Sequence, residues 1–288
     1  MALAGVTFLS ACLKDDNFVD FSKVGTLVEL PLAAYNPDAK GNKIVVLSYP
    51  SDATSVDHQV VVNVASPEPV SSNLDVTLKV DDAALTAYNT ANATTYTLMP
   101  TNVYTIPSLK VTVPSGQRTT ALIVKFNPSL ITDFTKQYVL PISIADASGQ
   151  KISNYKTVFY VVGVKNKYDG TYKVNGNALR AGDPVLSGTF PEQTYKLITA
   201  GPNSVQFSKT AVWASGAGIG GISEWILTVN PVTNAVTITD NANPAVTANP
   251  AGINTYDPAT KTFRIKAYWG NGPTHRAWEA TFVYSGPR

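Results

Sequence analysis

The chain has 288 residues and a net charge of +2, and only 15% of its residues are charged. This length favours two domains over one, and a nearly neutral composition without a basic stripe argues against nucleic-acid binding. One cysteine and two histidines exclude internal disulfides, thiolate metal sites and histidine-rich centres, so we expect no metal and no cofactor.

The N-terminal segment contains the single cysteine, Cys12, after a short apolar run over residues 3–9 and two small residues. This arrangement resembles the lipobox of a bacterial lipoprotein signal, and the resemblance implies cleavage before Cys12 and a lipid on its thiol. The Lys-Asp-Asp run at residues 14–16 resembles the surface-export signal of Bacteroidota lipoproteins. We therefore expect a signal over residues 1–11, a polar tether over 12–25, and a lipid-anchored protein exposed on the outer membrane.

The expected signal departs from the usual pattern. Residues 1–11 contain no Lys or Arg and are shorter than the roughly 15–30 residues of a secretory signal, so we expect a truncated or misplaced start. The alternative is that Cys12 is a small buried apolar residue, which the adjacent charges disfavour. No run of about 18 apolar residues follows Cys12, so we expect no membrane-spanning helix.

The segment from residue 26 to 165 shows the period-two alternation of β-strands, with turn residues between the apolar runs. One helix is predicted at residues 82–88, with Asp81 or Asp82 as its N-cap. Short strands at regular spacing indicate a β-sandwich. The predicted strands are 26–32, 43–49, 59–64, 73–80, 109–113, 119–126, 138–144 and 155–164.

A second segment begins after Lys165-Asn166-Lys167, and we expect two domains, 26–165 and 166–288. Within the second, residues 230–238 and 257–265 repeat one pattern, in which Asn or Asp precedes Pro and a strand follows three residues later. This is the chemistry of a hairpin turn and predicts an up-and-down antiparallel sheet. The strands predicted here are 203–207, 224–229, 235–239, 262–269 and 278–284.

Four ordered motifs carry a family resemblance: DVTLKVD at 75–81, AYN at 87–89, YTLMP at 96–100 and YVLPISI at 138–144. Residues 26–164 resemble the N-terminal Ig-like domain of Bacteroidota surface lipoproteins encoded in glycan-utilisation loci, a domain type that also precedes some endo-β-N-acetylglucosaminidases. The remainder opens with Tyr-Asp-Gly-Thr-Tyr at 168–172 and, with Tyr-Asp-Pro at 256–258, resembles a lipocalin-like C-terminal domain.

The resemblance implies an all-β protein, an Ig-like β-sandwich followed by a lipocalin-like antiparallel barrel or sheet. It also implies a Sus-type (starch-utilisation-like) surface protein that binds a glycan or assists one that does. The implied partners are a glycan, the outer membrane, and a Sus-type importer or other surface lipoproteins.

Motifs for catalysis are weak in this sequence. Gly216, Gly218 and Gly221 satisfy G-x-G-x-x-G, but a strand pattern follows where a dinucleotide site needs a helix, so we interpret the segment as a flexible loop. Glycosidases use two facing carboxylates, and Glu224 and Glu279 are the candidate pair; the alternative is that each points to solvent from the outer face of a strand. We predict no enzyme activity, because there is also no G-x-S-x-G elbow and the histidines are few.

Aromatic residues are the strongest indication of a ligand site, because a flat ring stacks on sugar C–H faces while amides and arginines bond hydroxyls. All four tryptophans lie in the second segment. Alternation places Trp225 and Trp278 in the core, whereas the other two flank loops. The predicted glycan-binding rim contains Trp213, one of Tyr268 and Trp269, Asn271, His275 and Arg276. The alternative is that these tryptophans pack inside an ordinary hairpin.

Three functions follow from these observations. The first is a lipid-anchored glycan-binding protein, which needs exposed rings on one surface. The second is a structural, accessory or adhesin-type surface protein without sugar affinity. The third is a glycoside hydrolase that uses Glu224 and Glu279, which requires the two carboxyls within roughly 5–10 Å.

Overall fold

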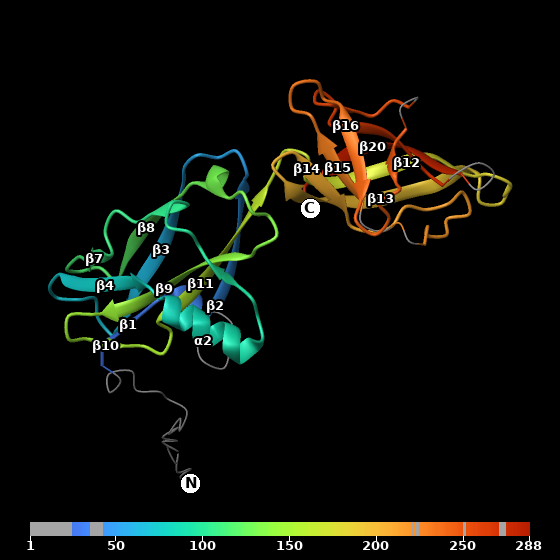
Figure 1. The fold of residues 1–288 in the computed structure, drawn as a ribbon. Coiled ribbons are helices and arrows are strands. Elements are labelled where there is room, and N and C mark those ends of the chain that lie inside the picture. The colour runs from blue at the N-terminus through green and yellow to red at the C-terminus, as the bar shows by residue number, and fades with distance from the viewer. Residues whose placement is uncertain (1–24, 35–42, 221, 223–224, 250–251, 271–274) are drawn as a thin grey trace, which may run out of the picture.

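The computed structural model describes residues 25–34, 43–220, 222, 225–249, 252–270 and 275–288. Cys12, the predicted signal and nearly all of the tether lie outside these residues, as do Glu224 and Asn271. Figure 1 shows two β-rich units joined end to end, which we name the sandwich (residues 27–165) and the barrel (residues 168–286). Within the described ranges, no helix has the length and apolar character needed to cross a membrane.

The sandwich consists of two facing sheets. Its strands are β1 (Leu27–Glu29), β2 (Lys43–Pro50), β3 (Val56–Ala65), β4 (Leu74–Val80), β5 (Thr97–Leu98), β6 (Tyr104–Thr105), β7 (Lys110–Val113), β8 (Thr119–Phe126), β9 (Tyr138–Asp146), β10 (Lys151–Ile152) and β11 (Thr157–Lys165). One sheet has the order β10-β1-β3-β8-β6; the other has β2-β11-β9-β4-β7, with β5 beside β9. Val60, Val62 and Val64 of β3 point into the shared core, as the alternation predicts.

Helix α2 (Asp82–Asn92) covers the outer face of the second sheet. Asp81 caps it by accepting a hydrogen bond from the amide of Ala84, which confirms the predicted helix and its cap. Leu85 of α2 packs on Val139 and Phe159. Strand β9 is therefore buried on both faces from residue 138 to residue 144.

The barrel is a single antiparallel sheet of nine strands that nearly closes on itself. Its strands are β12 (Gly170–Arg180), β13 (Gly188–Gly201), β14 (Ser204–Phe207), β15 (Trp225–Val229), β16 (Val236–Asp240), β17 (Thr247–Ala248), β18 (Thr255–Asp257), β19 (Thr262–Trp269) and β20 (Arg276–Gly286). The order is β16-β15-β14-β13-β12-β20-β19-β17, with β18 also beside β19. A bridge between Ala235 and Thr255 brings the two ends together. The predicted all-β fold is therefore confirmed, including its barrel-like second part.

The repeated Asn/Asp-Pro pattern forms two matching hairpins. The Asn230 side chain accepts hydrogen bonds from the amides of Val232 and Thr233, and Asp257 accepts the corresponding bond from Ala259. Four residues after each of them the backbone turns left-handed, with φ of 59° at Asn234 and 50° at Lys261. These turns connect β15 to β16 and β18 to β19, as the sequence predicts.

The secondary-structure prediction is wrong at its first strand and incomplete elsewhere. The first predicted strand, 26–32, ends at Glu29, because Pro31 begins a short helix, α1 (Pro31–Ala34). Strands β12 and β13, with 11 and 14 residues, are missing from the prediction, as are the short strands β5, β6, β10, β17 and β18.

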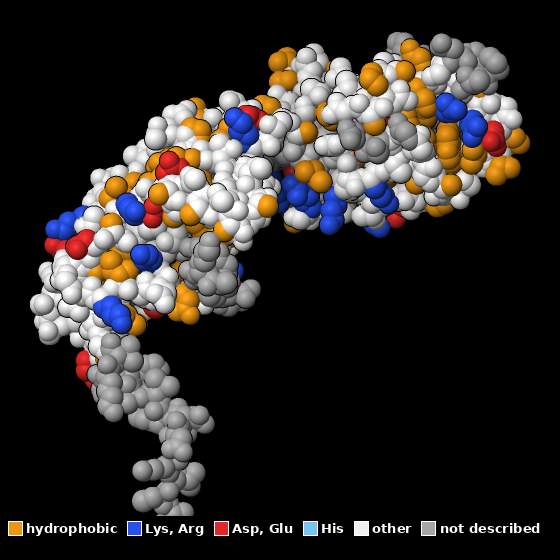
Figure 2. All heavy atoms as spheres, turned by 60° about the horizontal axis from the view of Figure 1, so that its bottom comes forward, with side chains coloured by type: hydrophobic (Ala, Val, Ile, Leu, Met, Phe, Trp, Pro, Cys, Tyr) orange, Lys and Arg blue, Asp and Glu red, His pale blue; other side chains and the backbone are white. Residues whose placement is uncertain are grey.

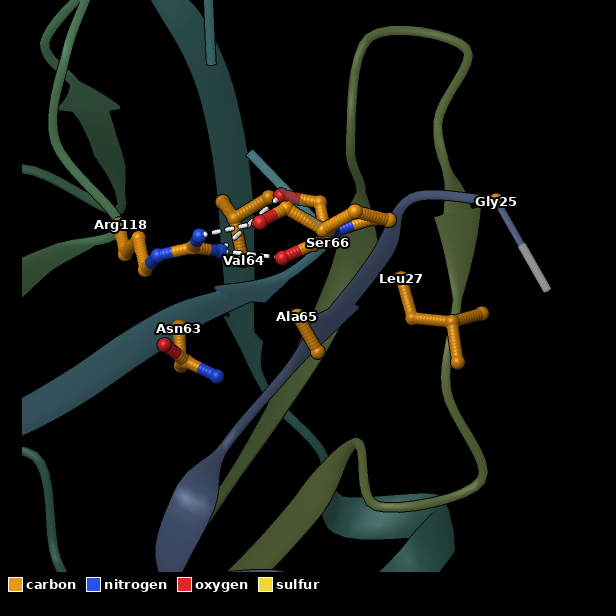
Figure 3. A pocket seen from close by; sticks show the side chains of 8 residues that line it. Gly25, Leu27, Asn63, Val64, Ala65, Ser66 and Arg118 are labelled. Atoms are coloured by element: carbon orange, nitrogen blue, oxygen red, sulfur yellow. Dashed lines mark hydrogen bonds between the residues drawn. The ribbon is translucent and has the colours of Figure 1, made fainter. Parts of the chain in front are cut away.

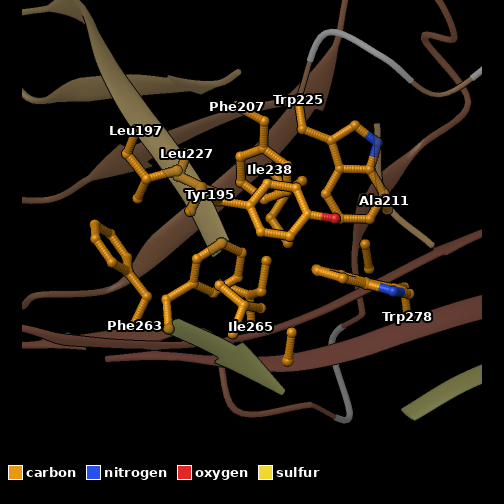
Figure 4. Close-up of a cluster of buried hydrophobic side chains, with 14 of the residues drawn as sticks. Tyr195, Leu197, Phe207, Ala211, Trp225, Leu227, Ile238, Phe263, Ile265 and Trp278 are labelled. Atoms are coloured by element: carbon orange, nitrogen blue, oxygen red, sulfur yellow. The ribbon is translucent and has the colours of Figure 1, made fainter. Parts of the chain in front are cut away.

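Large side chains fill the inside of the barrel. Trp225 and Trp278 are fully buried, which confirms their predicted place in the core. Figure 4 shows them beside Tyr195 and Phe207, in one cluster with Phe263. Trp278 stacks on Phe190 with ring centroids 5.0 Å apart. The interior is thus a packed core.

Candidate functional site

Two of the predicted rim tryptophans are buried. Trp213 is 6% exposed and Trp269 is 4% exposed, so the expectation that these rings face solvent is wrong. Trp269 points inward with Ile265 and Ala267 on alternate positions of β19. Trp213 lies against it, with ring centroids 6.2 Å apart. Both therefore belong to the core, together with Trp225 and Trp278.

The glycine-rich segment (residues 211–219) includes Trp213 and covers Trp269. The indole of Trp278 donates a hydrogen bond to the carbonyl of Val212 at 2.9 Å, and Val212 pairs with Gly218. Ala211, Val212 and Ile219 of the same segment join the barrel core. The segment packs against the barrel core, and strand β15 follows it from Trp225, while Gly221 lies outside the described residues.

Tyr268 is the predicted aromatic that does reach solvent, with 36% of its surface exposed. It lies on the outer side of β19 because Trp269 occupies the inner side. Directly opposite Tyr268 lie Thr247 on one neighbouring strand and Ala277 on the other. Ala277 in turn faces Leu179, which is 41% exposed. These residues form an apolar row across four strands, with a hydroxyl at one end.

Two further rows continue the outer surface of β19, β20 and β12. The first joins Lys266, Glu279 and Asn177, and the second joins Arg264, Thr281 and Asn175. We name these two rows and the apolar row together the outer face. Lys266 and Glu279 form an ion pair of 3.0 Å, and Asn177 accepts a hydrogen bond from Thr189 at 2.9 Å. The outer face thus places amide, hydroxyl and charged groups beside an apolar strip.

The chemistry of the outer face suits a ring-shaped polar ligand. A tyrosine ring offers apolar area with little loss of side-chain entropy, and asparagine and threonine can both donate and accept hydrogen bonds. Glu279 points to solvent, as its alternative interpretation predicted, and it also pairs with Lys266. Glu224 lies outside the described residues, so the proposed carboxylate pair has one described member. No group of three or more metal-ligating side chains gathers within the described part of the chain.

His275 and Arg276 lie at the rim of the barrel, where β20 begins, and both are half-buried. The carbonyl of His275 accepts a hydrogen bond from the amide of Ala181. Arg276 lies directly opposite Trp269 on β19 and opposite Arg180 on β12. Arg180 and the outer-face residues of β12 were missed by the sequence reasoning, because β12 itself was missed.

The rim lies far from the sandwich. Strand β12 leaves the linker at Gly170 and reaches the rim at Arg180, a distance of about 33 Å at the usual rise per residue. Figure 1 shows the β12–β13 hairpin at the end of the molecule opposite the sandwich. In Figure 2 the same end carries hydrophobic side chains next to a few basic and acidic ones.

A pocket of about 430 Å³ in the sandwich is the other candidate, shown in Figure 3. Gly25, the first described residue of the chain, forms part of its lining. Its one cation, Arg118, donates hydrogen bonds to the carbonyls of Ser66 and Pro67, and its amide, Asn63, donates to Glu29. The polar groups of this pocket are therefore engaged within the protein, and its lining contains no aromatic ring.

A family model matches the N-terminal part of the chain. Residues 29–151 match the family model described as a "-like, N-terminal domain". This match confirms the predicted resemblance for the first part of the chain. No curated protein sequence matches the chain.

Three solved structures share the fold over both parts. A protein of unknown function from Bacteroides ovatus has a TM-score of 0.61 at 14% identity, covering 91% of this chain and 95% of that chain. A multidomain protein including DUF1735, from the same species, has a TM-score of 0.52 at 16% identity over 90% and 94% of the two chains. An auxiliary nutrient binding protein from Bacteroides thetaiotaomicron has a TM-score of 0.50 at 16% identity, covering 85% and 91%. At these identities the similarity establishes the shared fold.

Proposed function

We propose that this chain, whose residues 29–151 belong to the matched N-terminal domain family, is a glycan-binding protein of the bacterial cell surface. In this proposal Cys12 carries a lipid that anchors the chain in the outer membrane, and the barrel holds a polysaccharide or oligosaccharide for a Sus-like glycan-utilisation system. The proposal is a binding role without catalysis.

The outer face of the barrel carries this proposal. Its apolar row contains the exposed Tyr268 ring, and asparagine, threonine and charged side chains follow in register on the next two rows. Because aromatic and aliphatic side chains fill the barrel, we expect a ligand to bind outside the barrel. The fold that the chain shares with an auxiliary nutrient binding protein also supports a binding role.

The position of the outer face also supports a tethered role. The predicted anchor precedes the sandwich, whereas the rim lies at the opposite end of the molecule. An anchored chain would then present the rim away from the membrane, where a polymer can reach it. A site near residue 25, such as the sandwich pocket, would lie beside the tether.

Affinity electrophoresis tests the proposed binding. Purified residues 25–288 are run through native gels that each contain one polysaccharide, and we expect retardation in at least one gel, reversed by free oligosaccharide. A folded protein that migrates unchanged across a broad panel of neutral and acidic glycans would refute glycan binding and favour the structural or accessory role.

The anchor is tested separately in the full-length chain. We expect mass spectrometry to find lipid on Cys12 and cell fractionation to place the protein in the outer membrane. Cys12→Ser should release the protein from the membrane without changing its migration in glycan gels. An unmodified thiol on the mature protein would refute the anchor.

A further inference from the structure

Two arginines face each other at the rim of the barrel. Arg180, the last residue of β12, is directly opposite Arg276, the first residue of β20. Side chains directly opposite on antiparallel strands share one face of the sheet and lie about 5 Å apart at Cβ, where like charges destabilise the pair. On its other side, Arg276 is opposite Trp269.

The acidic side chains among the described residues neutralise this pair only in part. Arg180 contacts Asp183 at 3.9 Å, the upper limit of an ion pair, and the same carboxylate also accepts the amides of Val185 and Leu186 in the hairpin turn. Among the described residues, Arg276 has no ion pair. The nearest acid on its strand, Glu279, lies on the outer face and binds Lys266. Among the described residues, acidic side chains therefore balance the positive charge of the rim only in part.

We propose that Arg180 and Arg276 bind the anionic substituent of an acidic glycan, a carboxylate or a sulfate. The inference rests on the proposed function and names its substrate class. A guanidinium donates two parallel hydrogen bonds to such an oxyanion, and two guanidiniums on adjacent strands offer a matching positive charge. Leu179 and Ala277 of the apolar row are their immediate neighbours in sequence and therefore point to the opposite side of the sheet. A glycan that lies on the apolar row would have to pass around the ends of β12 and β20 for its acidic group to reach the arginines.

Polysaccharides that differ only in charge test this inference. Polygalacturonate is compared with its highly methyl-esterified form, and dextran sulfate with dextran, in affinity gels at about 0.15 M salt, where long-range attraction is screened. We expect retardation by at least one acidic polymer and much weaker retardation by its neutral counterpart. The two pairs separate carboxylate from sulfate recognition.

Variants then assign the effect to the rim. Arg180→Gln and Arg276→Gln should each reduce affinity for the acidic polymer about tenfold. Lys196→Gln removes the same charge from β13, away from the outer face, and should change affinity by less than twofold. Arg276→Lys keeps the charge but loses the planar fork, and should restore only part of the affinity. Thermal unfolding of each variant verifies that the barrel is folded.

The outcomes separate this inference from the proposed function. Equal binding of the charged and neutral forms, unchanged in both arginine variants, would overturn the inference and leave glycan binding in place. Equal losses in the arginine variants and in Lys196→Gln would indicate general charge attraction and would also overturn it. Failure to bind any glycan would remove both.

Discussion

Replacing Tyr268 by alanine isolates the contribution of the exposed ring to ligand binding. Tyr268 lies on the outer side of β19, and its inward neighbours Ala267 and Trp269 hold the strand in the core. The substitution therefore removes a ring from the outer face without opening the barrel. We expect weaker glycan binding with the fold intact.

The exposed area sets the size of the effect. A tyrosine side chain offers about 200 Å², so the 36% exposure of Tyr268 leaves about 70 Å² for a ligand to cover. At about 25 cal/mol per Å², complete coverage contributes about 2 kcal/mol and coverage of one ring face about 1 kcal/mol. The dissociation constant should then rise about 5-fold to 30-fold.

Tyr155 provides a matched control, because it is also 36% exposed but belongs to the sandwich, just before β11. Tyr155→Ala loses the same exposed ring area and should leave affinity unchanged. Isothermal titration with the oligosaccharide selected by the gels measures both variants, and thermal unfolding measures their stability. Equal affinities of Tyr268→Ala and the unmodified protein, with similar unfolding midpoints, would refute a role for this ring.

Three further predictions concern the fold that supports the site. Gly176→Ala should destabilise the protein by at least about 3 kcal/mol, because the new Cβ would lie 1.9 Å from the carbonyl oxygen of Glu279. Gly163→Ala is the control, because its new Cβ would have its nearest atom at 3.8 Å. A similar thermal unfolding midpoint for the two variants would contradict this prediction. Burial lowers the pKa of His58 from 6.5, so the unfolded chain binds the proton more readily, and the free energy of unfolding should fall as pH drops through about 6.5. Urea unfolding at pH 7.5 and 5.5 measures that loss, which His58→Phe should reduce. Asp169→Asn should lower the free energy of unfolding by about 2 kcal/mol in the same assay, because the Asp169 carboxylate, which is 2% exposed, accepts two hydrogen bonds from Arg288 at 2.8 and 2.9 Å. An unchanged unfolding midpoint would show that this pair contributes no net stability.

Most strands of the sandwich could be predicted because one face of each strand is buried. The alternation over Val60, Val62 and Val64 places β3 correctly, and β8 begins and ends at the predicted residues 119 and 126. The packing of α2 on β9 could not be predicted in the same way, because a strand buried on both faces shows no alternation.

Strand β12 was missed for a physical reason that also explains its geometry. Its centre reads Asn-Gly-Asn at residues 175–177, a sequence typical of turns. In the structure Gly176 is required because the backbone of β20 approaches too closely for a side chain. Without β12, the sequence could not bring Leu179 and Arg180 beside β20, so only the Tyr268 side of the site was predictable.

The burial of Trp213 and Trp269 shows where alternation stops being informative. It correctly places Tyr268 and Trp269 on opposite faces of β19. It does not say whether the inner face is still covered at the last residue of the strand, because that depends on a segment distant in sequence. The glycine-rich segment around Val212 provides this cover, and its small residues allow it to approach the tryptophans closely.

A filled barrel has a consequence for the kind of ligand that the proposed site can hold. An enclosed pocket buries most of a ligand and can select chain ends, whereas the outer face contacts a ligand from one side and has no wall to exclude the rest of a polymer. Each contact on such a face is weak, because little surface is removed from water. Repeated units of one polymer can, however, rebind before they diffuse away, so affinity should rise with chain length faster than the number of contacts at one site. A tethered protein with an open face at its far end is therefore better suited to hold internal segments of a long polysaccharide than to capture short, released fragments.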